Sequence, residues 1–182
     1  MAQPGTYREV DGTAVPYSTA IDAWSDAALP VLMDTAHVYN AVITYKDLGQ
    51  AVQERTGIRT RVLLMNWIGQ VLERVAAECH RRGELQLTAL CVHQNGTVGT
   101  GYTGAVGRYG ETVPTDPELH AAEVRVTCYR KYAHNLPADG GRAQLTQQEA
   151  ARRRAVAPSQ PVRLCPVHHI ALPRTGLCDE CA

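Results

Sequence analysis

Two pairs of metal-binding residue types stand close to the C-terminus, in the segment CPVHHIALPRTGLCDEC. Two residues separate Cys165 from His168, and two separate Cys178 from Cys181. Each pair can bring two ligand atoms to one ion in a tight turn, and structural Zn²⁺ takes four Cys or His ligands at the corners of a tetrahedron. The spacing therefore predicts a structural Zn²⁺ site of three cysteines and one histidine, with His169 as the alternative fourth ligand.

The residues between the two pairs favour a zinc ribbon over residues 164–182. Pro166 fixes the backbone directly after the first ligand, and Gly176 supplies a permissive residue before the second pair. A segment of about 20 residues cannot bury enough apolar surface to fold alone, whereas zinc contributes an apparent ~10–16 kcal/mol. Four protein ligands leave no position for water, which predicts a structural role. A disulfide between these cysteines is the alternative.

Length and composition indicate one domain of ordinary size with an appendage. The 182 residues are 45% hydrophobic, which is enough for a core. The sequence has no run of 18 apolar residues, and its first residues do not match a signal peptide, so we expect a cytoplasmic protein that is not in a membrane. Thiols stay reduced there, so Cys79, Cys91 and Cys128 are predicted to be small buried apolar residues.

The formal net charge is zero, which argues against nucleic-acid binding through overall charge. The distribution is uneven: acidic residues dominate from Glu9 to Glu54, whereas arginines dominate residues 59–82 and fill positions 152–154. Basic surface is therefore expected to be local. Only two lysines, Lys46 and Lys131, stand against many alanines and arginines, which is typical of a high-GC bacterial genome or its phage.

Helical spacing of apolar residues predicts three helices in the first half of the chain. The first spans about residues 19–39, and Pro30 either kinks it or opens another helix. Thr44 and Asp47 form a capping-box variant for a second helix that ends at Gly57. The third follows a short glycine turn and ends at Gly83, so the pair resembles a helix-turn-helix.

The pattern then changes to the alternation of strands. Residues 85–93 alternate, Asn95-Gly96 is a hairpin signal, and residues 98–106 are predicted to return as the second strand. A capping box at residues 115–118 opens a helix whose buried face carries Leu119, Ala122, Val126, Tyr129 and Ala133, and Thr146 caps a short basic helix. The predicted fold class is α+β, with a winged helix-turn-helix-like core, extra helices and a small C-terminal zinc ribbon.

These elements give four expected parts of the chain. A flexible arm covers residues 1–17, a winged-helix-like domain with packing helices covers residues 18–154, a linker covers residues 155–163, and the zinc ribbon covers residues 164–182. The segments ITYKDLGQAV, IGQVLERVAAEC and LTALCVHQNGTVGTGY make residues 42–103 similar to the DNA-binding domain of alkylguanine-DNA alkyltransferases. They also resemble small winged-helix modules found beside bacterial nucleases.

The resemblance implies a DNA-binding surface on the second helix of the pair, which enters the major groove in such modules. Asn and Gln can read adenine, and Arg can bind guanine or phosphate. The side chains that fit this exposed stripe, which is otherwise a solvated helix face, are Arg59, Arg61, Asn66, Gln70 and Arg74.

Motifs for catalysis are absent from the sequence. An alkyltransferase needs a reactive cysteine in a P-C-H-R segment, and residues 89–93 read ALCVH. Cys91 and His93 would share one face of a strand, so a nucleophile with its base is a minor alternative. Phosphate-loop, hydrolase-elbow, zincin and complete HNH nuclease patterns are missing.

The sequence therefore predicts a non-enzymatic protein of bacterial or phage origin that binds double-stranded DNA. The zinc ribbon is expected to be an auxiliary contact to DNA or to a protein partner. The alternative function is a protein-interaction adaptor that uses both the winged helix and the ribbon.

Overall fold

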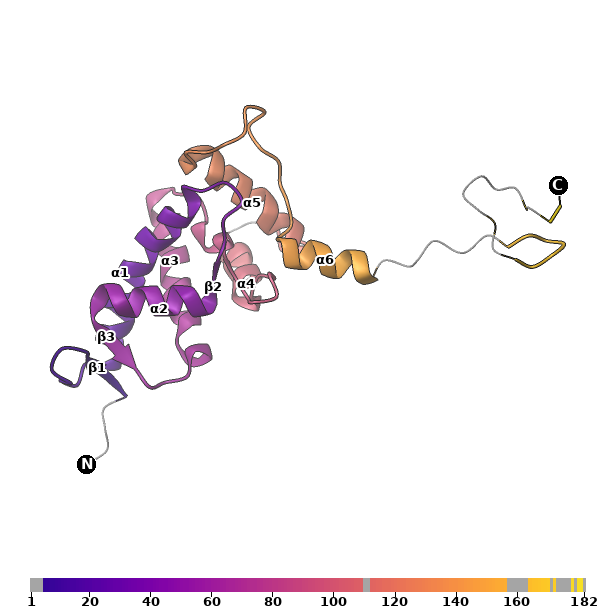
Figure 1. Cartoon of the computed structure of the whole chain (residues 1–182). Helices are drawn as coiled ribbons and strands as arrows, with labels where there is room; N and C mark the ends of the chain where they lie inside the picture. The colour runs from indigo at the N-terminus through magenta and orange to yellow at the C-terminus, as the bar shows by residue number, and fades with distance from the viewer. Residues whose placement is uncertain are drawn as a thin grey trace. The chain divides into compact units, whose positions relative to one another are not determined.

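The computed structural model describes residues 5–109, 112–156, 164–170, 172, 178, 180 and 181 (Figure 1). The chain forms two compact units, residues 1–149 and residues 150–182. In chain order the elements are β1 (Thr6–Arg8), α1 (Tyr17–Ala36), β2 (Ile43–Thr44), α2 (Tyr45–Thr56), β3 (Ile58–Thr60), the 3-10 turn η1 (Leu64–Asn66), α3 (Ile68–Arg82), the 3-10 turn η2 (Leu87–Leu90), β4 (Cys91–Val92), α4 (Thr100–Arg108), α5 (Pro117–Tyr132) and α6 (Gln147–Val156). The mixed helix and strand content confirms the α+β class.

Several helix boundaries follow the capping signals in the sequence. Thr44 accepts a hydrogen bond from the Asp47 backbone N–H at the start of α2, and Gly57 ends the helix with φ +63°. Gly83 ends α3 in the same left-handed conformation, which costs glycine little because it has no Cβ. Pro30 lies inside α1, so one continuous helix forms where the sequence left two alternatives open.

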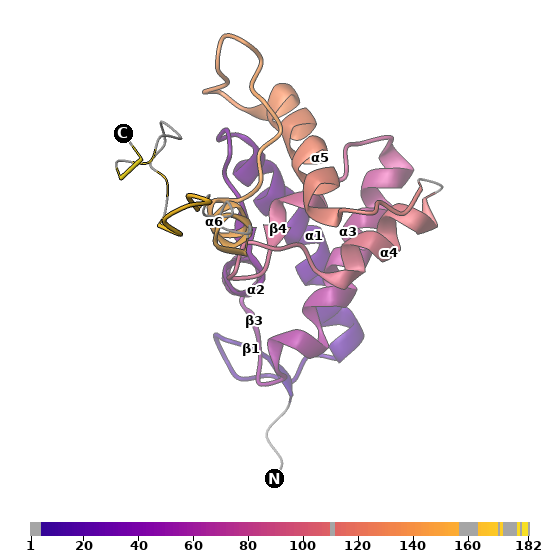
Figure 2. The same ribbon diagram turned by 90° about the vertical axis from the view of Figure 1, so that its right-hand side faces the viewer.

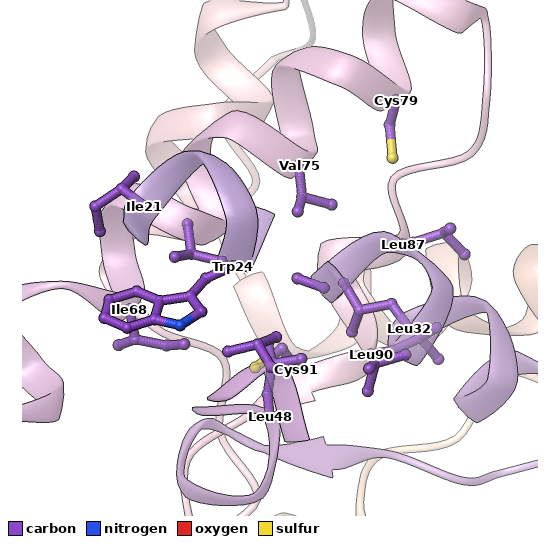
Figure 3. Packing of buried hydrophobic residues seen from close by; sticks show 14 of the residues in the cluster. Ile21, Trp24, Leu32, Leu48, Ile68, Val75, Cys79, Leu87, Leu90 and Cys91 are labelled. Carbon is purple, nitrogen blue, oxygen red and sulfur yellow. The ribbon is translucent and has the colours of Figure 1, made fainter. Parts of the chain in front are cut away.

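The main core lies between α1, α2, α3 and η2. Figure 3 shows Trp24 and Leu32 of α1 gathered with Leu48 of α2 and Val75 of α3, and all four are fully or almost fully buried. The indole rings of Trp24 and Trp67 lie 4.4 Å apart, and the Trp24 N–H donates to the Ile58 carbonyl oxygen at 3.1 Å. Burial of two tryptophans with one donor satisfied makes this contact a large contribution to stability.

Two short sheets flank the helices. β1 pairs with β3 in antiparallel register, with Tyr7 opposite Arg59. β2 pairs with β4 in parallel register, with Ile43 opposite Cys91. The first pairing shows that the segment predicted as a flexible arm contains a strand, so that prediction is wrong for residues 6–8.

The predicted β-hairpin wing differs from the structure. Residues 93–97 do form a tight turn, in which the His93 N–H donates to the Thr97 carbonyl oxygen at 2.7 Å. The segment after it is α4 and not a second strand, and α4 packs against α3 (Figure 2). Val98, Tyr102 and Val106 are buried at a spacing of four, which fits one face of a helix as well as one face of a strand.

The connection between α2 and α3 also differs from the prediction. It covers residues 57–67 and contains β3 and η1, whereas a helix-turn-helix uses a turn of about three to four residues. α3 therefore begins at Ile68, later than the sequence pattern indicated. Most of the predicted linker, residues 157–163, lies outside the described residues.

Among the residues that the structure describes, no helix is both long enough and apolar enough to cross a membrane.

Candidate metal centre and nucleic-acid surface

The four predicted zinc ligands come together in the C-terminal unit. The ligand atoms of Cys165, His168, Cys178 and Cys181 all lie within 4.8 Å of one another. Two tight turns produce this arrangement: the His169 N–H donates to the Cys165 carbonyl oxygen at 2.9 Å, and the Cys181 N–H donates to that of Cys178 at 3.0 Å. Each turn therefore presents both of its side chains to the same point.

The distances within the cluster match the edges of a zinc tetrahedron. His168 Nδ1 lies 3.7 Å from Cys165 Sγ, 3.5 Å from Cys178 Sγ and 3.3 Å from Cys181 Sγ. The Sγ atoms of Cys165 and Cys181 are 3.6 Å apart. Tetrahedral zinc with ordinary bond lengths implies S–N edges of about 3.6 Å and S–S edges of about 3.8 Å. The donor set and its dimensions therefore fit Zn²⁺.

The geometry selects His168 over His169 as the fourth ligand. His168 contacts all three sulfur atoms through one ring nitrogen, whereas His169 is not among the clustered ligands. The backbone of His169 has φ +55°, a conformation that few residues other than glycine adopt. That conformation follows the ligand turn at once, so His169 has a role in reversing the chain.

Hydrogen bonds within the cluster shift the pKa values of two of its cysteines in opposite directions. The backbone N–H groups of His168 and Val167 hydrogen-bond to Cys165 and lower its pKa to about 6. A hydrogen bond to Cys165 raises the pKa of Cys181 to about 11. These hydrogen bonds favour the thiolate form of Cys165 and the thiol form of Cys181, so zinc binding has to release the proton of Cys181.

The five residues predicted to contact DNA lie on different elements. Only Gln70 and Arg74 belong to α3, where their spacing of four places them on one face. Asn66 ends the 3-10 turn before it, Arg59 lies in β3, and Arg61 lies in the connection that follows. The predicted stripe is thus spread over a helix, a turn and a strand edge.

Two of these arginines have acidic partners within the first unit. Arg59 Nε lies 2.9 Å from Glu9 Oε2, and Arg74 forms an ion pair with Asp22. The Arg61 guanidinium lies over the Tyr7 ring, 4.9 Å from its centroid. The Gln70 amide donates to the Tyr17 hydroxyl at 3.2 Å. Binding of a phosphate group by Arg59 or Arg74 therefore requires exchange of an existing ion pair.

Residues of η1, α3 and α4 line an open groove of 650 Å³. Met65, Asn66 and Gln70 line one part of it, and the glycines Gly101 and Gly104 line another. Met65 is 80% exposed, and a Cβ atom added at either glycine would have no neighbour within 4 Å. The groove is therefore open, and two predicted DNA-contact residues share its wall with an exposed apolar side chain.

Cys91 does not have the environment of a nucleophile. It is 1% exposed, and burial raises the pKa of its thiol far above the ordinary range. His93 is exposed, and its ring lies against Tyr45 with centroids 4.6 Å apart. Cys79 and Cys128 are buried free thiols too, which confirms the prediction that these three cysteines act as apolar core residues.

One functional candidate has no counterpart in the sequence motifs. Arg125 of α5 is 2% exposed, whereas Leu119, predicted for the buried face, is 49% exposed. The signal was present in the spacing, because Arg125 stands three residues after Ala122 and four before Tyr129, both buried. Helical spacing alone could therefore have indicated that Arg125, although basic, occupies a core position.

No protein-family model, no curated protein and no solved structure matches the chain.

Proposed function

We propose that the chain is a non-enzymatic protein that binds double-stranded DNA, with the zinc-bearing C-terminal unit as its main electrostatic contact. The observation that carries this proposal is the division of charge between the two units. Residues 1–149 contain 13 basic and 16 acidic residues, a net charge of −3, and residues 150–182 contain 5 basic and 2 acidic residues, a net charge of +3. Neutralisation of DNA phosphates by Arg and Lys dominates such binding, which favours the second unit.

The helix α6 presents part of this charge in a compact form. Arg152, Arg153 and Arg154 follow one another near its C-terminal end, and Arg152 and Arg154 are exposed. Zinc binding at the Cys3His site would stabilise a folded segment after α6, because metal-binding energy acts as folding energy. An arginine cluster joined to a small zinc-clamped module is well suited to grip a phosphate backbone.

The first unit supplies the sequence-reading surface in this proposal. Asn66 and Gln70 are exposed, and their amides can make two hydrogen bonds to the edge of adenine. In this proposal α3 is the helix that enters the major groove. Because Arg59 and Arg74 carry ion pairs, we expect the amides to matter for base preference more than these arginines matter for affinity.

A fluorescence-anisotropy titration of random duplex DNA at two salt concentrations tests the proposal. We expect binding that weakens steeply with salt, and removal of zinc by a chelator should weaken it further. Gln70→Ala should alter preference among sequences while leaving the salt dependence intact, and Arg61→Ala should lower affinity for all sequences alike. Absence of binding at low salt by the zinc-loaded protein would exclude the DNA function.

A second candidate function, a protein-interaction adaptor, is favoured by the groove between α3 and α4. Met65, which is 80% exposed, lines the groove, and Leu63, which is 67% exposed, stands two residues before it, so two large apolar side chains are available to a partner. In this case a partner protein would cover Met65. Met65→Glu would then abolish a salt-insensitive complex and leave DNA affinity unchanged, which separates the two functions.

A further inference from the structure

We propose that the cavity beside Arg125 in the first unit is a binding site for a phosphate group. The cavity has a volume of 260 Å³ and is lined by residues of α5 and of the segment that leads into α6. None of its lining residues belongs to α3 or is one of the four metal-binding residues, and the proposal does not depend on DNA binding.

Arg125 is a buried cation whose protein partners are neutral. Its Nη1 donates to the Ala89 carbonyl oxygen at 3.2 Å, and its Nη2 donates to the Gln144 carbonyl oxygen at 3.4 Å. Within the described residues, no carboxylate forms an ion pair with it. The carboxylate of Glu118 acts on it only at longer range and accepts the Val98 N–H at 3.0 Å. Arginine is almost never fully buried without a paired negative charge, so we expect a bound anion to supply the counter-charge of Arg125.

The walls of the cavity suit an anion. None of the eleven residues that line it is acidic. Arg142 adds a second positive charge, although its side chain is 85% exposed and lies 3.7 Å from an Asp139 carboxylate oxygen. The side-chain amides of Asn40, Gln144 and Gln148 are potential donors on the same walls. The lining therefore offers positive charge and neutral donors to a ligand that accepts hydrogen bonds.

Size and donor number point to phosphate. The cavity is smaller than the roughly 300–1,000 Å³ that drug-sized ligands occupy, so the buried part of the ligand is small. Arginine binds carboxylate and phosphate oxygens best, and phosphate has enough acceptor oxygens for several donors at once. The group can belong to free phosphate or to a nucleotide whose remainder extends out of the cavity. Both sources share the same recognition chemistry.

Arg130 provides a matched contrast on the same helix. It also donates to two backbone carbonyl oxygens, those of Gly140 at 2.9 Å and Gly141 at 3.0 Å. Unlike Arg125, it is exposed and does not line the cavity. Water screens the charge of Arg130, so this residue needs no bound anion.

The test compares thermal and chemical unfolding of the zinc-loaded full chain in sodium phosphate with unfolding in sodium chloride of equal ionic strength. At a phosphate concentration 100 times the dissociation constant, the unfolding equilibrium constant should fall about 100-fold. Titration calorimetry with inorganic phosphate and with a nucleoside monophosphate then identifies the source. Tighter binding of the nucleotide indicates a nucleotide site, and equal binding indicates free phosphate. Equal stability of the wild type in both salts overturns the proposal.

Three variants locate the effect. Arg130→Gln should keep the phosphate stabilisation, and Arg125→Gln should lose it. If Arg125→Gln does not fold, Asn40→Asp gives the same information, because it places a carboxylate on the cavity wall at a position with φ +64° that Asp tolerates. Asn40→Asp should be more stable than the wild type in chloride and should no longer respond to phosphate. An undiminished phosphate response of Asn40→Asp contradicts the proposed site.

Discussion

Replacement of two arginines of α6 gives a quantitative prediction for DNA binding. Arg152 and Arg154 are exposed near the end of this helix, and each is expected to neutralise one phosphate. Each lost contact reduces the slope of log K against log salt by about 0.9, so the variant Arg152→Gln/Arg154→Gln should lose about 1.8. Between about 50 and about 200 mM salt, its affinity should therefore fall about 12-fold less than that of the wild type.

Fluorescence anisotropy with one random duplex at several salt concentrations measures this slope. The control is Arg81→Gln/Arg82→Gln, which changes the net charge equally but on α3. Both arginines there bind the Glu78 carboxylate, at 2.6 and 2.5 Å, and their hydrogen bonds lower the Glu78 pKa to about 2. We expect a small change of slope in the control. Equal slope changes in the two variants would refute a specific α6 contact and indicate an effect of total charge alone.

Three other measurements test the metal site and the core. Cys181→Ser should abolish stoichiometric zinc binding, whereas His168→Cys and His169→Ala should retain it, as measured by absorption of the cobalt-substituted protein. Burial raises the pKa of Cys128 to about 12, so the folded state keeps this thiol neutral while the unfolded thiol ionises near ~8.5. The resulting stability is complete below that pH and is lost as pH rises toward 12, by at most ~1.4 kcal/mol per pH unit, and urea unfolding of Cys128→Ala should show a flatter pH dependence. Cys91 should resist thiol reagents in the folded protein and react after denaturation, and rapid native labelling would revive the nucleophile alternative.

The candidate metal centre was predictable because the spacing of its four residues is itself the geometric requirement. Two residues between paired ligands describe a tight turn, and the structure brings those four side chains together. The caps of α2 were predictable for a similar reason, since Thr44, Asp47 and Gly57 act through local backbone hydrogen bonds and φ angles. Tight turns and helix caps depend on residues only a few positions apart, so they can be predicted without the tertiary structure.

The error at α4 has a physical cause in the spacing of its apolar residues. Val98, Tyr102 and Val106 repeat every four residues, and four is compatible with the periods of both strand and helix. The tertiary environment decided between them: β4 pairs with β2, and the Glu118 carboxylate accepts the Val98 N–H just before α4. Neither interaction is visible in the local sequence.

The Arg125 cavity was not predictable, because its walls come from separate segments. Asn40 follows α1, Arg125 belongs to α5, and Gln148 belongs to α6. Helical spacing could have indicated that Arg125 faces the core. The absence of a carboxylate beside it, among the residues described, became apparent only from the three-dimensional arrangement.

X-ray absorption at the zinc edge of purified full-length protein tests the metal centre most directly. The Cys3His geometry predicts one zinc per chain, with three sulfur ligands at about 2.3 Å and one nitrogen ligand at about 2.0–2.1 Å. It also predicts that this spectrum is unchanged in His169→Ala. A spectrum with four sulfur ligands, with oxygen ligands, or with no stoichiometric zinc would contradict the account.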